Sequence, residues 1–148
     1  MSIMWMALRP AHVHAGHDRR APVPRRTGAA MRAKDALGRF GEDVAARHLA
    51  AVGAEILDRN WRCREGELDL VVQDGESLVF CEVKTRSGTR YGSAAEAVVG
   101  RKAARIRRLA ARWLAEHPHA SSLVRFDVLL VSRPSTGPVR VEHIRGAF

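Results

Sequence analysis

Two short segments of the sequence carry acids and a lysine at spacings that suit phosphate chemistry. The first reads GELDL and contains Asp69, and the second reads FCEVK and contains Glu82 and Lys84. Side chains two residues apart on a strand share a face, so Glu82 and Lys84 should point the same way. The intervening Asp74-Gly75 pair is typical of a tight hairpin turn. The pattern therefore predicts that two carboxylates and an ammonium converge.

Such a set of groups is suited to a divalent metal ion. Mg²⁺ or Mn²⁺ takes oxygen ligands, and one or two carboxylates plus waters and substrate phosphate commonly bind Mg²⁺. We expect Asp69 and Glu82 to be ligands, with the backbone carbonyl of Val83 as a further donor. Lys84 would orient or activate a metal-bound water and neutralise charge on the phosphate. Strand alternation also predicts that Leu68 and Leu70 lie together on the face opposite Asp69.

Longer motifs around these residues give a more specific signal. They follow in the order Gly38–Asp43, Arg59–Arg64, Gly66–Leu70, Cys81–Arg86 and Tyr91–Val98. Together they closely resemble the bacterial YraN family, a group of predicted endonucleases in the PD-(D/E)xK superfamily. The resemblance runs from about Ala36 to Phe148. It implies a nuclease-type core similar to archaeal Holliday-junction resolvases, acting on DNA and working as a homodimer.

The order of expected elements agrees with that resemblance. Apolar residues at helical spacing predict a helix that Asp35 caps and Gly53 ends, followed by three strands, a helix from Arg101, a strand at 124–131 and a short strand at 139–144. We therefore expect an α/β fold with the αβββαβ core of restriction endonucleases, a mixed sheet flanked by helices. The apolar Leu129 and Leu130 in the fourth strand could lie near a sheet edge and support a dimer, or be buried within one chain.

Glu42 in the first helix admits two interpretations. It is an acid on a solvated helix face, or it lies against the hairpin and joins the metal site as a ligand and catalytic group. The second interpretation rests on the resemblance to junction resolvases.

Basic residues predict a nucleic-acid partner. Lysines and arginines number 25 against 16 acids, a formal net charge of +9, and such an excess favours phosphate-bearing partners. The segment from Arg101 to Arg112 holds no acid, so an anionic partner would relieve its charge repulsion. Arg86 and Arg90 fall in an expected loop after Lys84, where they would clamp a phosphate. The residues expected to bind nucleic acid are Arg86, Arg90, Arg101, Lys102, Arg105, Arg108 and Arg112.

The remaining composition limits the compartment and the extent of the domain. No run of about 18 apolar residues is present, so we expect no membrane insertion. Two cysteines, Cys63 and Cys81, suit a cytoplasmic protein with free thiols. Residues 1–30 are basic and lack apolar periodicity; they form a disordered arm, or translation begins at Met31. We favour the start at Met31, with the nuclease-like domain spanning 31–148.

These observations predict a Mg²⁺- or Mn²⁺-dependent endonuclease-like phosphodiesterase acting on DNA, with branched or structured DNA as candidate substrates. The leading alternative is a nucleic-acid-binding module that keeps the fold and serves recombination, repair or DNA uptake without cutting. A third option is a nuclease that acts on RNA. The intact set of Asp69, Glu82 and Lys84 favours the enzyme.

Overall fold

The computed structural model describes residues 28–88, 101–118 and 123–148. Two helices and five strands make up this part of the chain. In order they are α1 (Gly28–Ala51), β1 (Glu55–Cys63), β2 (Gly66–Asp74), β3 (Ser77–Ser87), α2 (Arg101–Glu116), β4 (Leu123–Arg133) and β5 (Arg140–Ile144). The predicted αβββαβ order is therefore confirmed, with β5 as the additional strand.

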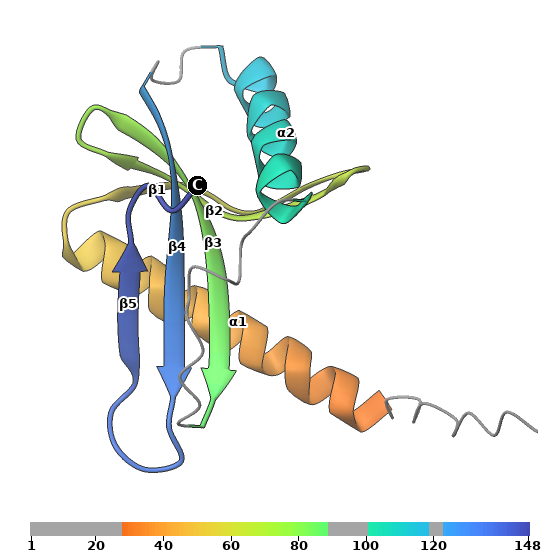
Figure 1. Ribbon diagram of the computed structural model, residues 1–148, viewed down its shortest axis with the longest axis vertical. Helices are drawn as coiled ribbons and strands as arrows, with labels where there is room; N and C mark the ends of the chain where they lie inside the picture. Colours follow the sequence, from red (N-terminus) through yellow and green to blue (C-terminus); the bar gives the residue numbers. More distant parts are fainter. Residues whose placement is uncertain (1–27, 89–100, 119–122) are drawn as a thin grey trace, which may run out of the picture.

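The strands form one mixed sheet in the order β1-β2-β3-β4-β5. Neighbours are antiparallel except β3 and β4, which run parallel and are joined through α2. A parallel pair needs such a crossover connection. Figure 1 shows α1 and α2 on opposite faces of the sheet, with the β1–β2 hairpin projecting away from the other strands. Neither described helix is long and apolar enough to cross a membrane.

Each helix buries its own apolar core against the sheet. Under α2, Phe80 and Val128 pack with Trp113, and under α1, Val79 and Leu129 pack with Leu49. The indole N–H of Trp113 also donates to Asp58 Oδ2 of β1 at 3.0 Å. This hydrogen bond fixes α2 over the hairpin.

Several boundaries differ from the sequence-based expectation. Helix α1 begins at Gly28, so Asp35 lies within the helix and does not cap it. Strand β3 continues to Ser87, which places Arg86 in a strand where a loop was expected. Strand β4 lies between β3 and β5, and Leu129 and Leu130 are buried within the chain. These leucines therefore give no support to a dimer, which stays a prediction.

The β2–β3 ladder ends in the middle of β2. Register pairs run from Asp74↔Ser77 to Leu70↔Cys81 and stop there. Leu70 packs in the α1 core, whereas Leu68 packs in the α2 core, so the predicted common face of these two leucines is wrong. The reason is a break in alternation at Asp69, beyond which the hairpin tip turns towards α2. The sheet therefore divides at Asp69 and leaves a gap beside β3.

A glycine brings α1 close to the other side of that gap. A Cβ atom added at Gly41 would lie 1.7 Å from Oγ1 and 2.8 Å from Cβ of Thr85 on β3. Only a residue without a side chain permits this approach. Gly41 thus sets the distance between Glu42, its neighbour in α1, and strand β3.

We expect Gly41→Ala to lower the free energy of unfolding by about 1–3 kcal/mol, because the added methyl overpacks against Thr85. Gly38→Ala is the matched control in the same helix, since a Cβ there meets nothing within 4 Å; better helix propensity should leave it neutral or stabilise it by up to about 1 kcal/mol. Urea denaturation measures both. Equal stability of the two variants would show that α1 does not need this close approach.

Candidate active site

In this site the side chain of Asp69 takes the place of a backbone hydrogen-bond acceptor. Asp69 Oδ2 accepts a hydrogen bond of 2.7 Å from the backbone N–H of Val83. Continued register would have set Leu68 opposite Val83, so the Asp69 carboxylate satisfies the donor that the departing strand leaves behind. This hydrogen bond holds the carboxylate against β3.

The same geometry turns the Val83 carbonyl towards the gap. In a strand the N–H and C=O of one residue lie on the same side, and in an antiparallel ladder both bond to the same neighbour. The N–H of Val83 points at Asp69, beyond the end of the ladder with β2. Its carbonyl oxygen therefore lies on the side of the gap, where it can serve as an additional oxygen ligand.

Glu82 lies beside this pair and is held by two lysines. Its Oε1 atom is 2.7 Å from Nζ of Lys84 and also contacts Nζ of Lys102, and the Glu82 side chain is only 12% exposed. Glu82 and Lys84 share a face of β3, as predicted. Lys102 comes from the first turn of α2 and was predicted to bind nucleic acid, so its place on Glu82 is a new finding.

The two lysines are not equivalent in their surroundings. Burial lowers the pKa of both ammonium groups, and for Lys84 the hydrogen bonds to Glu82 and Lys102 and the charges of Glu82 and Asp69 together outweigh this, leaving its pKa raised. For Lys102 burial and the nearby Lys84 prevail over Glu82, and its pKa is lowered. Lys84 is therefore the more firmly charged partner of Glu82.

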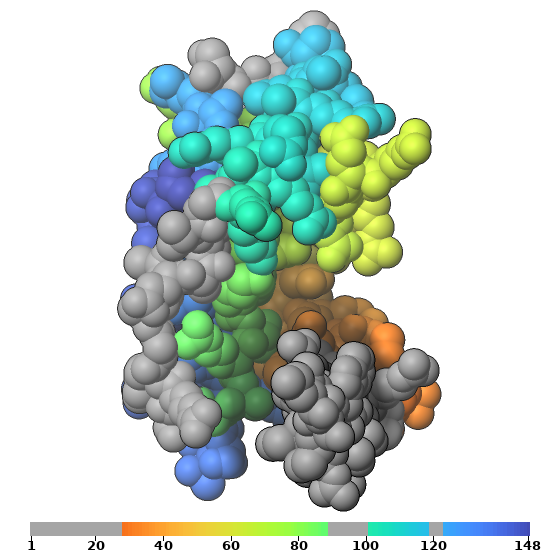
Figure 2. Space-filling model, turned by 45° about the vertical axis from the view of Figure 1, so that its right-hand side comes forward, coloured from red at the N-terminus to blue at the C-terminus, as the bar shows by residue number. Residues whose placement is uncertain are grey.

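These groups lie at the floor of an open cavity of about 350 Å³, which we call the cleft. It is lined from α1 by Lys34, Leu37, Gly38 and Glu42, from β2 by Glu67 and Asp69, from β3 by residues 82–85, and from α2 by Lys102, Arg105, Ile106 and Leu109. Figure 2 shows the hollow between the tip of the β1–β2 hairpin (yellow) and α1 (orange).

The cleft crowds acids together. The pKa of Asp69 is raised to about 7: burial raises it most, the negative charges of Glu82 and Glu42 add to this, and the Val83 N–H and Lys84 oppose them. Glu42 thus faces the same cavity as Asp69, in agreement with the interpretation that joins it to the site. Lys34 was missed from the sequence, although it precedes Gly38 and Glu42 at helical spacings of four and eight residues.

The donor set fits a hard divalent ion. Among the described residues no three Asp, Glu, His or Cys side chains come close enough to hold an ion by themselves. Mg²⁺ does not require three, because it commonly binds through one or two carboxylates and keeps several waters. Asp69 and Glu82 supply two carboxylates and Val83 a carbonyl, and Glu42 lines the same cleft. Burial, together with the charges of Glu82 and Glu42, raises the pKa of Asp69, and a bound cation would favour its ionised form.

The basic residues of α2 divide into groups with different surroundings. Arg101 and Arg108 are exposed. Arg105 lies across the hairpin: a Cβ added at Gly66 would be 2.4 Å from its Nη2 atom. Arg112 is paired, with Nη1 3.1 Å from Glu65 Oε1, so acids from outside the helix segment relieve part of its charge.

Two further candidates have different outcomes. Arg86 lies in β3, two residues beyond Lys84. Arg90 lies outside the residues that the structure describes, as does most of residues 1–30, so the expectations for them stay predictions.

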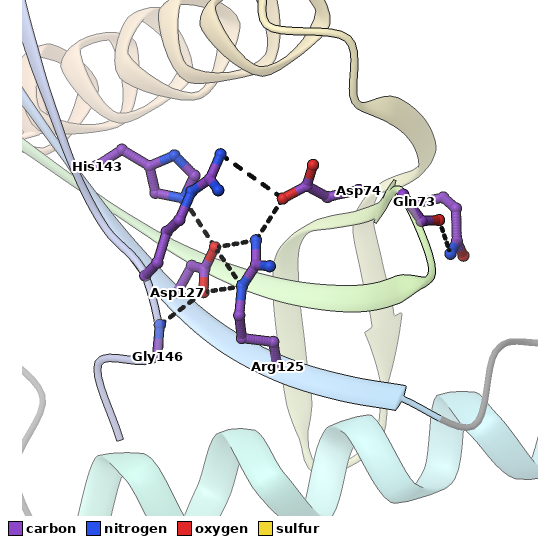
Figure 3. A network of polar contacts seen from close by, with 8 residues as sticks. Gln73, Asp74, Arg125, Asp127, His143 and Gly146 are labelled. Carbon is purple, nitrogen blue, oxygen red and sulfur yellow. Dashed lines mark hydrogen bonds and ion pairs between the residues drawn. The ribbon is translucent and has the colours of Figure 1, made fainter.

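A second charged cluster is structural. Asp127 is fully buried and accepts hydrogen bonds from Arg125, from the N–H of Gly146 and from Nε2 of His143 at 2.7 Å (Figure 3). Burial alone would raise the pKa of Asp127, but these donors leave it lowered. Arg125 also pairs with Asp74 at 2.6 Å. The cluster joins β2, β4 and β5, because its members come from these strands and from the residues after β5. Both oxygens of Asp127 have donors, so this carboxylate is used within the fold.

We expect Asp69→Asn to stabilise the metal-free protein at pH 8 by on the order of 2 kcal/mol, because it removes a carboxylate that folding makes costly to ionise. The folded-state pKa of Asp69 is raised, so wild-type stability is fullest below the unfolded value of 3.8 and is lost as the pH rises towards about 7. The difference between variant and wild type should therefore vanish near pH 4.

Chemical denaturation at pH 4, 6 and 8 with chelator measures this difference. Glu55→Gln is the control, since Glu55 is exposed on β1. A variant less stable than wild type at pH 8 would contradict the crowding of acids in the cleft.

The chain is similar to proteins of one family across most of its length. Residues 41–131 match the family described as "Uncharacterised protein family UPF0102". A UPF0102 protein of Frankia alni is 87% identical over 119 residues, which are 80% of this chain and 99% of that protein. Those of a Parafrankia species and of Beutenbergia cavernae are 72% and 60% identical, over 80% and 78% of this chain and 100% and 98% of their own lengths.

The names of these relatives state a family and no activity, so the function must be argued from the cleft. Their identity and coverage settle the family itself. The chain belongs to the UPF0102 family, the YraN group that its motifs resemble.

Proposed function

We propose that this protein is a Mg²⁺- or Mn²⁺-dependent endonuclease that hydrolyses phosphodiester bonds in DNA. The observation that carries the proposal is the division of the sheet at Asp69, which leaves two carboxylates, a strand carbonyl and an ammonium on the floor of one open cleft. Hydrolysis of a phosphodiester by a metal-bound water needs oxygen ligands that hold the ion and a cation beside the phosphate.

Each group in the cleft has a distinct task in this proposal. Asp69, Glu82 and the Val83 carbonyl would hold the ion, which lowers the pKa of a bound water and offsets charge on the phosphate. Lys84 would orient the attacking water and stabilise the charge that develops on the phosphate oxygens. Glu42 lines the same cleft and would accept hydrogen bonds from the ion's remaining waters.

The arrangement of arginines favours a polymer over a small phosphate ester. Arg105 lines the cleft and also a second recess formed with Arg62 and Arg64 at the hairpin tip. Arg101 and Arg108 continue the positive charge along the exposed side of α2. Cations in a row suit a backbone that carries a phosphate at every nucleotide.

One observation favours the alternative of a binding module that does not cut. Oε1 of Glu82 contacts two ammonium groups, so the protein satisfies this carboxylate from its own side chains. Cleavage assays distinguish the two functions, because a binding module would retain DNA without producing fragments.

We expect the wild type to cut at least one DNA among linear duplex, single-stranded, flap and four-way substrates in Mg²⁺ or Mn²⁺, and to lose all cutting in excess chelator. Lys84→Met should lower the cleavage rate about 100-fold or more, because a cation at the reacting phosphate is lost. The same variant should still bind Mn²⁺ in a calorimetric titration. Cutting that survives the chelator would refute the metal-dependent mechanism.

We expect the double substitution Arg101→Gln with Arg108→Gln to flatten the salt dependence of DNA binding. Each phosphate contact on duplex DNA contributes roughly 0.9 to the slope of log affinity against log salt. Arg107→Gln is the control in the same helix, because its guanidinium lies over the Phe126 and Phe148 rings. Fluorescence anisotropy measures the slopes. A double variant with the wild-type slope would show that this side of α2 only faces solvent.

A further inference from the structure

The lysines of this chain are confined to one place. The sequence has only three, Lys34, Lys84 and Lys102, among its 25 basic residues. All three line the cleft, where Arg105 is the one arginine among the described lining residues, while arginines supply the positive charge elsewhere. Lysine offers a compact ammonium on a flexible stem, whereas arginine is larger, planar and suited to bidentate pairing. The distribution indicates that the cleft needs ammonium groups and that the rest of the surface does not.

Two of these ammonium groups share one oxygen atom. Lys84 and Lys102 both contact Oε1 of Glu82, which is also a proposed metal ligand. A metal ion bound to a carboxylate oxygen lies about 2.1 Å from it. An ion and two ammoniums around a single carboxylate would place four positive charges within a few ångströms, and their repulsion favours the departure of one ammonium when the ion enters.

Lys102 is the ammonium that is free to leave. Lys84 belongs to the same strand as Glu82 and stands two residues away on the same face, so it stays beside the carboxylate. Lys102 reaches Glu82 from the first turn of α2, a different element of the fold, while the exposed fractions of the two lysine side chains are similar, at 35% for Lys102 and 31% for Lys84. The stem of Lys102 can rotate away without moving the sheet.

This inference rests on the proposed function. We propose that Lys102 is an internal counter-ion that pairs with Glu82 when no metal is bound and competes with the divalent ion for this carboxylate. Once the ion displaces it, the Lys102 ammonium turns to a DNA phosphate. Lys102 then links two binding events. Metal entry frees a cation for the phosphate, and the phosphate offers that cation a new partner, so each ligand favours the other.

Calorimetric titration of Mn²⁺ at pH 8 tests the competition. Lys102→Met removes the competing charge and should tighten Mn²⁺ binding about tenfold or more. Lys102→Arg keeps the charge and should bind Mn²⁺ no more tightly than the wild type. Lys34→Met is the matched control, a cleft lysine with no ion pair to Glu82 among the described residues, and should change the affinity less than about threefold.

The outcomes separate this inference from the proposed function. If Lys102→Met binds Mn²⁺ as tightly as the wild type or more weakly, the counter-ion role is overturned while the metal site stands. Absence of Mn²⁺ binding in the wild type and in every variant would overturn both proposals. A larger Mn²⁺-induced rise in melting temperature for Lys102→Met than for the wild type would support the role independently of activity.

Binding to a 20-base-pair duplex in EDTA tests the transfer to phosphate. Glu82→Gln imitates neutralisation of the carboxylate by a metal, so it should release Lys102 and tighten DNA binding. Adding Lys102→Met to Glu82→Gln should remove about one phosphate contact, or roughly 0.9 of the salt slope. Equal slopes for Glu82→Gln and the double variant would overturn the transfer.

Discussion

One hydrogen bond between a side chain and the backbone organises this molecule. Where β2 leaves β3, the N–H of Val83 loses the partner that a continued ladder would have supplied, and Asp69 Oδ2 takes its place at 2.7 Å. An unpaired buried N–H is costly, so the sheet can divide at this point only because a carboxylate satisfies the donor. The same hydrogen bond fixes the Asp69 carboxylate next to Glu82. Opening of the sheet and assembly of the site are therefore one event.

The rest of the fold keeps that opening in place. The indole of Trp113 holds α2 to Asp58 of β1, so the hairpin tip is drawn towards α2 and away from β3. Gly41 lets α1 approach Thr85 from the other side. The cost of crowding acids in the cleft is offset elsewhere, by the two apolar cores and by the fully satisfied Asp127 cluster.

Sequence patterns predicted the groups of the site better than their surroundings. Period-two alternation placed Glu82 and Lys84 on one face because β3 is a regular strand there. The same rule failed for Leu68 and Leu70, since the divided ladder reverses the faces at Asp69, and alternation contains no information about where pairing stops. The start of α1 was also misplaced, because Asp35 has the side chain of a helix cap but lies inside a longer helix.

Contacts between distant elements were beyond sequence reasoning. The charge run of α2 predicted an anion, but one of its members, Lys102, contacts the protein's own Glu82, which lies 20 residues away in sequence. The pairing of Arg112 with Glu65 likewise depends on how α2 crosses the hairpin. Periodicity identifies the side of a helix that is charged; only the tertiary fold determines which charges are left for a partner.

The most direct test of the metal site is the anomalous scattering of Mn²⁺ in crystals of the wild-type protein. The division of the sheet at Asp69 predicts a peak in the cleft, about 2.1 Å from carboxylate oxygens of both Asp69 and Glu82, with Lys102 moved off Glu82. No peak in the cleft at a Mn²⁺ concentration that supports cleavage, or a peak bound by other residues, would contradict the account.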